Sequence, residues 1–190
     1  VWKKPERIAT DDPVNRREEE LLSIIPRDSK RRYDLYKILE HVLDRNSFFE
    51  IAPFYGSSRI TGLARVNGYP IGVMINNPNR LGGSTDGAAG EKAMKLWSLC
   101  DTFHLPVVSF VDEPGFMVGM DAQNKGIVRA GARMVVAQCR SQSPWISFYM
   151  KQAYGVAGQT HHRTRGMYHR YAWPSGKWGS MHIEGGVSAA

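Results

Sequence analysis

The chain is 190 residues long, and its 42% hydrophobic and 23% charged residues are ordinary for one globular domain. The formal net charge is +7, but Lys and Arg are spread along the chain without an aromatic-interleaved RNA-binding pattern, so nucleic acid is not an expected partner. No apolar run approaches the roughly 20 residues that span a bilayer, so no membrane association is expected either.

The two cysteines, Cys100 and Cys139, each lie among apolar neighbours in a helical pattern. This favours two small buried thiols over a disulfide or a catalytic nucleophile. Because the first residues lack the apolar core of a signal peptide, the expected compartment is a reducing one, either the cytoplasm or the mitochondrial matrix.

The first predicted boundary lies near residue 30. Residues 1–30 are polar, charged and interrupted by prolines, which indicates a linker or interdomain arm, and residues 31–190 are expected to form the folded domain. Apolar residues at helical spacing predict an amphipathic helix from Ser29, with Asp28 or Ser29 as its N-cap, ending before Asn46.

An alternation of strands and helices follows. The apolar segments 60–66 and 69–75 flank Asn67-Gly68, which is a strong hairpin signal. A Gly-rich turn then leads to a predicted helix over 87–103, with Asp86 as its N-cap. The remaining expected elements are a strand over 105–111, a helix over 123–141, a strand over 145–150 and a further short helix. This order predicts an α/β fold, a sheet covered by helices.

The candidate active-site loop follows the predicted strand over 105–111. It reads Asp112-Glu113-Pro114-Gly115-Phe116. Open α/β sheets bind ligands at the carboxyl ends of their strands, so a Pro-Gly turn in this place is a candidate site. Alone it is weak, because a plain type II turn uses the same residues.

Several short motifs along the chain occur in the same order as in one known protein family. They lie at residues 62–68, 76–78, 83–86, 100–101, 111–116, 126–133, 153–157 and 171–174. Together they resemble the carboxyltransferase component of biotin-dependent acyl-CoA carboxylases, of the propionyl-, methylcrotonyl- and acetyl-CoA carboxylase type. The resemblance covers about residues 30–190 and matches the C-terminal crotonase-like domain. It implies a ββα spiral with helices packed on the sheet.

The implied chemistry moves a carboxyl group from carboxybiotin, carried on a carrier protein, to the α-carbon of an acyl-CoA thioester. Both reactants develop negative charge on an oxygen, so the site needs fixed amide donors more than ionisable side chains. By resemblance, the backbone amides of Val156 and Ala157, after the turn at Gly155, would hold the oxyanion on the biotin side. Family members often have Gly where this chain has Val156, and a positive φ there would strain a β-branched residue. A plain strand-to-helix turn at Gly155 is the structural alternative.

The same resemblance assigns the biotin pocket. Gly115 would allow the close approach of the backbone, Phe116 would pack on the bicyclic ring, and Pro114 would begin the turn. No metal site is expected, because adjacent His161 and His162 on a helix would point about 100° apart. The basic run that they begin, residues 161–165, is predicted to be a solvent-facing basic surface, with an anion-attracting surface as the alternative.

The implied partners are an N-terminal carboxyltransferase domain or subunit, which would supply most of the acyl-CoA site, together with the biotin carboxyl carrier and biotin carboxylase. A homo- or hetero-oligomer is expected, because the family's catalytic cleft forms between subunits. The sequence stops before the family's helical tail, so we expect a domain that is incomplete at its C-terminal end and inactive without the N-terminal half.

Two other functions remain open from the sequence. A biotin-independent acyl-CoA enzyme of the crotonase type would add a general base to its oxyanion hole, and Asp112 or Glu113 is available for that role. A non-catalytic scaffold subunit of a carboxylase complex would keep the fold alone.

Overall fold

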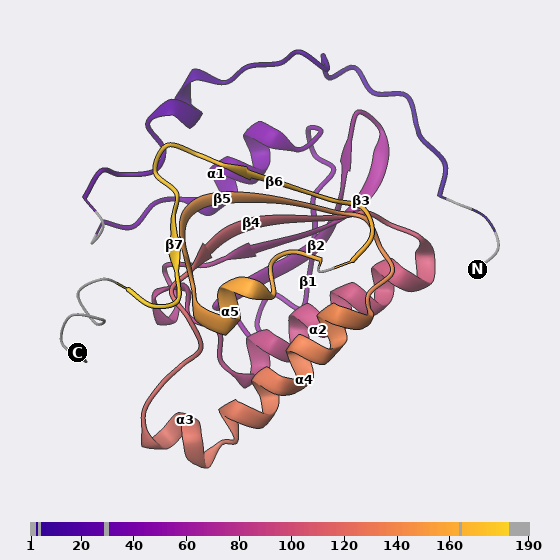
Figure 1. The fold of residues 1–190 in the computed structure, drawn as a ribbon. Coiled ribbons are helices and arrows are strands. Elements are labelled where there is room, and N and C mark those ends of the chain that lie inside the picture. The colour runs from indigo at the N-terminus through magenta and orange to yellow at the C-terminus, as the bar shows by residue number, and fades with distance from the viewer. Residues whose placement is uncertain (1–2, 4, 29–30, 164, 183–190) are drawn as a thin grey trace.

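A seven-stranded mixed sheet organises the computed structural model, which describes residues 3, 5–28, 31–163 and 165–182 (Figure 1). The strands are β1 (Phe49–Ile51), β2 (Arg59–Val66), β3 (Tyr69–Asn76), β4 (Val107–Glu113), β5 (Trp145–Tyr154), β6 (Tyr168–Ala172) and β7 (Lys177–Gly179). The helices are α1 (Leu35–Val42), α2 (Gly87–Phe103), α3 (Met120–Asn124), α4 (Ile127–Arg140) and α5 (Gly155–Gln159), with 3-10 turns η1 (Glu19–Leu22) and η2 (Leu81–Gly83).

The predicted hairpin is confirmed. Strands β2 and β3 pair antiparallel, with Val66 opposite Tyr69. Asn67 and Gly68 between them have φ values of 50° and 76°, the left-handed conformations that a tight two-residue hairpin turn requires. The two turn amides donate to the carboxylate of Asp44, at 2.8 and 2.7 Å, which satisfies donors that the strands leave unpaired.

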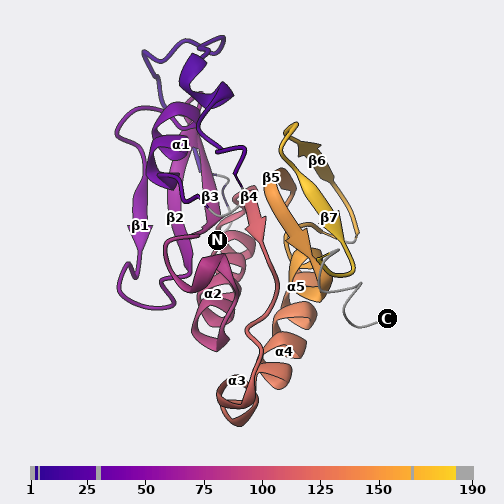
Figure 2. The same ribbon diagram turned by 90° about the vertical axis from the view of Figure 1, so that its left-hand side faces the viewer.

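From β3 onward the sheet is parallel, in the order β3-β4-β5-β6. Strand β5 pairs with β4 along one side, and on the other side with β6 near its start and with β7 over Gln152–Tyr154. Figure 2 shows β4 and β5 side by side, with α5 directly after the end of β5. Because parallel neighbours end at the same edge of a sheet, the turns after β4 and β5 lie together.

Alternation along the strands divides the interior between two faces. Val108 and Phe110 of β4 pack on the face covered by α1, whereas Val107 and Trp145 pack on the face covered by α2 and α4. We call the first group the α1 cluster; its buried members are Tyr33, Leu35, Ile38, Leu39, Leu43, Ile60, Ala64, Ile71, Val73, Ile75, Val108, Phe110 and Met150.

The amphipathic helix near the N-terminus begins later than predicted. It starts at Leu35, and the Asp34 side chain accepts a hydrogen bond from the Tyr36 amide at 2.9 Å. Asp34 rather than Asp28 is therefore the N-cap, and Ser29 lies outside the described residues. The sequence offered several acidic and hydroxyl residues in this stretch, so propensity alone could not select one.

The helix over 87–103 is confirmed, and its Asp86 cap accepts the Ala89 amide at 2.8 Å. The helix predicted over 123–141 is confirmed as α4 over Ile127–Arg140, but its start is wrong, because the preceding residues form the separate helix α3. Gly126 separates them with a φ of 75°, a left-handed conformation that interrupts a regular helix. The strand predicted over 145–150 runs on to Tyr154, where β7 supplies a further partner.

Residues 5–28 lie across α1 and the hairpin rather than away from the domain (Figure 1). Arg7 donates to the carbonyl of Asn67 at 2.7 Å. Arg16 donates to the carbonyls of His41 and Leu43 at the end of α1, at 2.9 and 2.8 Å. Backbone carbonyls at a helix C-terminus need such donors, so the arm caps α1 from outside. Its role between domains stays a prediction.

One of the two cysteines departs from expectation. Cys100 is buried as predicted, and burial raises the pKa of its thiol to about 12. Cys139 is exposed instead, on the solvent side of α4. Cys139 follows the buried Gln138 in α4, and consecutive side chains on a helix point about 100° apart. The apolar neighbours of Cys139 in the sequence did not reveal that it faces solvent.

Candidate functional site

The two predicted turns meet at one edge of the sheet. The Pro114-Gly115-Phe116 loop follows β4, and Gly155 begins α5 directly after β5. Because β4 and β5 are parallel neighbours, the structure brings both sets of predicted residues to this edge. Val156 is exposed and Ala157 is buried, so the first turn of α5 has one side chain in solvent and one in the core.

The positive φ that would strain Val156 does not occur at that residue. Positive φ occurs at Gly155, with a value of 60°, and Val156 lies inside the helix that follows. The left-handed residue of the turn is therefore a glycine, which adopts this conformation at little cost. The side chain of the N-cap residue, Tyr154, makes no capping hydrogen bond, so it leaves the first amides of α5 free to meet another acceptor.

The backbone of the β4 loop is held on both sides. The Thr85 amide donates to the Gly115 carbonyl at 3.0 Å, and the Met117 amide donates to the Thr85 carbonyl at 2.9 Å. The Gly115 amide in turn donates to Glu113 Oε1 at 3.1 Å. Gly115 has a φ of 135°, which favours glycine, so this residue type is required by the loop's own conformation.

Phe116 is turned partly inward. It is half-buried and packs with the apolar residues between α2, α4 and the sheet. A Cβ added at Gly131 of α4 would lie 3.2 Å from the Phe116 ring, so the ring rests directly on that glycine. One side of the ring is thus occupied by α4, and its wall-forming role for biotin stays a prediction.

Beneath this edge lies a fully buried group of polar side chains, which we call the Glu113 cluster. Glu113 Oε2 accepts hydrogen bonds from several donors, which are Arg59 Nη2 (2.5 Å), Thr85 Oγ1 (2.5 Å), Asn76 Nδ2 (3.0 Å) and His161 Nε2 (3.3 Å). Arg59 Nη2 also donates to Thr85 Oγ1 at 2.7 Å. The exposed fractions of Arg59 and Glu113 are both 0%, which makes theirs a buried ion pair.

The charges in the Glu113 cluster follow from these contacts. Burial by itself raises the pKa of the Glu113 carboxyl, but the hydrogen bond from His161 and the charge of Arg59 outweigh it, and the pKa lies below its ordinary value. Burial, followed by the charge of Arg59, lowers the pKa of His161 to about 4. At neutral pH the cluster therefore holds one guanidinium, one carboxylate and a neutral imidazole.

His161 corrects the prediction of a solvent-facing basic surface. Its exposed fraction is 0%, its Nδ1 lies 2.8 Å from Ser109 Oγ, and its carbonyl accepts a hydrogen bond from Ser147. His162 is also buried, and its carbonyl accepts from the Gln138 side chain. The chain leaves α5 at Gln159, so the helical spacing assumed for these histidines does not apply.

The two adjacent carboxylates of β4 point to opposite faces of the sheet. Asp112 lies on the α1 side, where its carboxylate accepts from Tyr33 at 2.8 Å and from Gln152 at 3.3 Å. Burial raises the pKa of Asp112, against the hydrogen bond from Tyr33. Asp112 and Glu113 are 1% and 0% exposed, so neither carboxylate is available to a substrate as the free base that the crotonase-type alternative requires.

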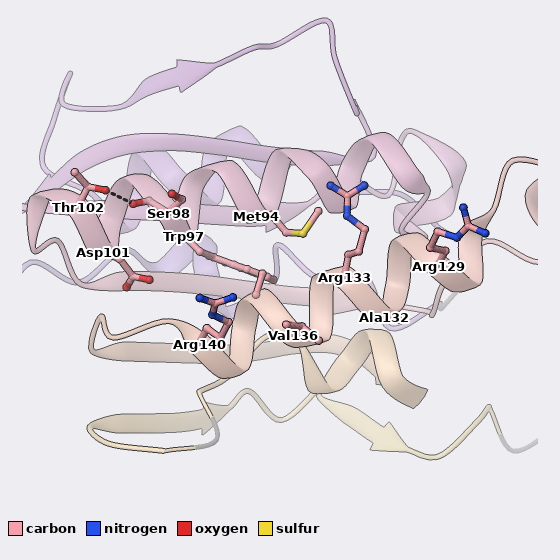
Figure 3. Close-up of a pocket in the computed structure, with 11 residues that line it drawn as sticks. Met94, Trp97, Ser98, Asp101, Thr102, Arg129, Ala132, Arg133, Val136 and Arg140 are labelled. Carbon is pink, nitrogen blue, oxygen red and sulfur yellow. Dashed lines mark hydrogen bonds between the residues drawn. The ribbon is translucent and has the colours of Figure 1, made fainter.

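A groove of about 630 Å³ runs between α2 and α4 (Figure 3). Its α4 wall carries Arg129, Arg133 and Arg140, which are exposed, and Trp97 of α2 forms part of its floor. Asp101 lies on the α2 side, but its Oδ1 already accepts from the backbone and side chains of residues 141–143. None of the residues predicted to bind biotin lines this groove.

A second hollow, of about 960 Å³, opens one residue beyond Phe116. It lies between the start of α2 and the segment that holds α3, and Met117 and Val118 contribute to its wall. Among the described residues, no three His, Cys, Asp or Glu side chains gather as a metal site. Over the same part of the chain, no helix is both long and apolar enough to cross a bilayer.

Sequence reasoning missed most of the Glu113 cluster. Arg59 was not singled out, Asn76 and Thr85 appeared only inside the family motifs, and Glu113 was considered only as part of the loop and as a possible base. One signal was available. Arg59 directly precedes the apolar run of β2, a strand that is buried on both faces at this end, so its charged side chain needs a buried partner.

A family model described as the carboxyl transferase domain matches residues 2–190. The propionyl-CoA carboxylase carboxyltransferase subunit of Haloferax mediterranei is 32% identical over 188 residues, which is 98% of this chain and 35% of that protein. The methylmalonyl-CoA carboxyltransferase 12S subunit of Propionibacterium freudenreichii subsp. shermanii is 34% identical over 170 residues, or 89% of this chain and 32% of that protein.

Solved structures of carboxyltransferases also match this chain. Transcarboxylase 12S, described as a hexamer assembly with hydrolyzed methylmalonyl-coenzyme A bound, matches with a TM-score of 0.92 and 31% identity, over 98% of this chain and 36% of that one. The beta subunit of Pseudomonas aeruginosa geranyl-CoA carboxylase matches with a TM-score of 0.82 at 23% identity, over 98% of this chain and 35% of that one. The crotonase-like α/β fold is thereby confirmed. The chain spans about a third of the length of these relatives.

Proposed function

This chain belongs to the carboxyl transferase domain family, and on that premise we propose that it forms the biotin-facing half of an acyl-CoA carboxyltransferase. In the proposed reaction the carboxyl group leaves a ureido nitrogen of carboxybiotin and bonds to the α-carbon of an acyl-CoA thioester, and the α-proton that the thioester gives up passes to that nitrogen. The carboxyl donor and the thioester are both substrates brought to this chain by other components.

The observation that carries the proposal is the meeting of two backbone turns at one edge of the sheet. The loop of Gly115 and the turn of Gly155 end neighbouring parallel strands, and each has a glycine with positive φ. Glycines in such turns let a flat ring approach the main chain, and the first amides of α5 are the donors available there, because the Gly115 amide already donates to Glu113. A bicyclic ureido ring, with one polar carbonyl and two apolar flanks, fits a site of this kind.

The role proposed for α5 is to hold negative charge. When the carboxyl group departs, charge develops on the ureido oxygen, and fixed amides stabilise it without reorganisation. The amides of Val156 and Ala157 belong to the first turn of α5, where intrahelical acceptors are missing and the Tyr154 side chain makes no capping hydrogen bond. Phe116 would cover one flank of the ring, supported from behind by Gly131.

The acyl-CoA thioester, in this proposal, binds mainly to an N-terminal carboxyltransferase domain or subunit. Support comes from the length of the relatives, of which this chain spans about a third. Transcarboxylase 12S is a hexamer, and here exposed apolar side chains such as Val118, Met120 and Trp178 are available for contacts between subunits. Biotin carboxylase and the carboxyl carrier would charge and deliver the biotin.

The decisive experiment measures carboxyl transfer by the assembled enzyme from a carboxylated carrier to propionyl-CoA. Turnover should require both substrates, whereas a biotin-independent acyl-CoA enzyme would act without the carrier. Replacing Phe116 with Ala should weaken binding of free biotin while leaving the affinity for propionyl-CoA nearly unchanged. The reverse pattern would place the loop on the thioester side and refute the assignment of this half.

The oxyanion role is tested by Ala157→Pro, which deletes one amide donor within the first helical turn, where proline is tolerated. Loss of one such donor typically costs about 10² to 10³ in turnover. Gln159→Ala, at the exposed end of the same helix, is the matched control. Equal losses in both variants, with circular dichroism intact, would show that α5 contributes only structure.

A further inference from the structure

Glu113 contacts the loop of Gly115 directly and contacts His161, which lies two residues after the end of α5. The Glu113 carboxylate lies beneath the edge where biotin is proposed to bind, with an exposed fraction of 0%. We propose that Glu113 is a positioning residue, which fixes the loop of Gly115 and, through His161 at the end of α5, that helix in one arrangement from inside the protein. The proposal rests on the assignment of this edge as the biotin side.

Both carboxylate oxygens contact the loop region. Oε1 accepts the Gly115 amide at 3.1 Å, in the two-residue spacing at which a side chain can fold back on its own turn. Oε2 accepts Thr85 Oγ1 at 2.5 Å, and the Thr85 backbone pairs with residues on both sides of the loop. Glu113 therefore fixes the loop directly and also fixes the segment beside it.

Oε2 also connects Glu113 to the end of α5. Oε2 lies 3.3 Å from His161 Nε2, and His161 follows the end of α5 at Gln159 by two residues. The His161 amide donates to the carbonyl of Gly158 within α5. Because His161 is neutral and a carboxylate only accepts, its proton resides on Nε2, and Nδ1 accepts the Ser109 hydroxyl proton at 2.8 Å. The end of α5 is thereby tied to Glu113 through a single imidazole.

The geometry requires a carboxylate rather than an amide. The groups that face Glu113 all present protons to it, and the Gly115 N–H and the Arg59 guanidinium cannot reverse their roles. A glutamine could satisfy Gly115 with its oxygen only by turning its NH₂ toward Arg59. Turned the other way, the NH₂ would face the Gly115 amide.

A role in stability alone does not account for this arrangement. A buried ion pair is often replaced by apolar side chains of similar volume without loss of stability, whereas removal of one partner is costly. Arg59 and Glu113 could thus be exchanged for an apolar pair if packing were their only task. What an apolar pair cannot supply is an acceptor for Gly115 and His161.

The test compares two double variants in the assembled enzyme. Arg59→Met with Glu113→Leu removes both charges and every acceptor. Arg59→Met with Glu113→Gln removes the same charges but retains one oxygen, which can now face Gly115 because Arg59 is absent. Neither variant leaves a buried charge unpaired, so both should fold. Tyr33→Phe, which alters a buried hydroxyl on the opposite face of β4, is the matched control.

Two readouts separate positioning from stability. Hydrogen exchange over residues 115–117 and 155–159 should rise about tenfold or more in the Leu variant, because the Gly115 amide and the His161 imidazole both lose their acceptor. The KM for carboxylated carrier should rise by about tenfold, since the site is no longer held in shape, while the KM for propionyl-CoA changes less than about twofold. The Gln variant should recover most of both losses, and Tyr33→Phe should show neither.

The outcomes also separate this proposal from the proposed function. Unchanged exchange at both turns in the folded Leu variant would overturn the positioning role, even if biotin chemistry is established. Equal losses in the Leu and Gln variants would also overturn it, because the acceptor would then be irrelevant. If the Leu variant loosens both turns but wild-type enzyme neither binds biotin nor accepts carboxyl from the carrier, positioning stands and the biotin assignment fails.

Discussion

The α1 cluster and the Glu113 cluster are both buried, on opposite faces of the same sheet, but different forces hold them. The α1 cluster is built from apolar side chains such as Leu39 and Phe110, each of which gains roughly 1.5–3 kcal/mol from full burial. The Glu113 cluster has a charged pair at its centre, whose attraction is largely offset by the loss of hydration.

The difference shows that the α1 cluster contributes mainly to stability, whereas the Glu113 cluster mainly fixes the positions of the groups around it. Apolar contacts are non-directional, so the α1 cluster can adjust to a changed side chain by small shifts. Hydrogen bonds to Glu113 have fixed donors and directions, so the loss of one partner leaves the others unsatisfied. Substitutions in the α1 cluster should therefore lower stability in proportion to the side-chain volume removed. Loss of any one partner in the Glu113 cluster should disturb the whole cluster.

The largest expected effect comes from breaking the ion pair on one side only. Arg59→Met should lower the free energy of unfolding by about 3–5 kcal/mol, because Glu113 is then left buried without its cation. Adding Glu113→Leu should restore most of that loss. Urea unfolding of the two variants checks this. A single variant as stable as the wild type would mean that water already enters the Glu113 cluster.

A comparable but purely local loss is expected in the α1 cluster. Leu39→Ala should cost about 2–5 kcal/mol, set by the cavity that remains. Hydrogen exchange at residues 115–117 should stay unchanged relative to global stability, because no directional contact links Leu39 to the loop. Faster exchange confined to the loop would erase the distinction between the two clusters.

Acid should weaken the Glu113 cluster before it affects the α1 cluster. The pKa of His161 is about 4 when folded and about 6.5 when unfolded, so the unfolded chain binds more protons between these values. Stability must therefore fall as pH falls through this window, by up to about 3 kcal/mol. The lowered pKa of Glu113 acts in the same direction at lower pH, and the raised pKa of Asp112 opposes both.

Urea midpoints from pH 7 to pH 4 measure this dependence. His161→Met removes the titrating group and should flatten the slope over the window. If stability depends on pH equally steeply in the variant, other groups cause the acid sensitivity. Asp112 is not among them, because its raised pKa stabilises the folded protein in acid.

The smallest expected change in stability tests the contact between α4 and the loop. Gly131→Ala gains helix propensity of about 1 kcal/mol, but its Cβ would lie 3.2 Å from the Phe116 ring and push it outward. Net stability should change by less than about 1 kcal/mol, whereas affinity for free biotin should fall. Gly87→Ala in α2, whose Cβ would lie 3.9 Å from Ala130, is the control. Biotin affinity lost equally in both would implicate the helices in general.

Local signals in the sequence predicted the local parts of the fold. Asn67-Gly68 determined the hairpin, and Asp86 with the apolar spacing after it determined α2, because each depends on neighbours in the chain. The interruption at Gly126 was missed, since one glycine inside a helical pattern does not reveal its φ. The motif order located Gly115 and Gly155, and the parallel register then placed them at one edge.

The buried polar contacts could not be predicted in the same way. Arg59 and Glu113 are 54 residues apart, and nothing local marks them as partners. His161 looked like part of a basic surface because its own neighbours are basic. Burial and pairing are tertiary properties, and they reverse the ordinary expectation for a charged or titratable side chain.

The branching of the sheet at β5 bears on the order in which the protein assembles. Strands β2 and β3 join through two residues, whereas β5 must find β4, β6 and β7 across intervening segments. Contacts that close long loops form late in folding, because their entropy must be overcome first. Arg59 and Glu113 would then lose their water near the end of the pathway. We expect substitutions of this pair to accelerate unfolding and to leave the refolding rate almost untouched.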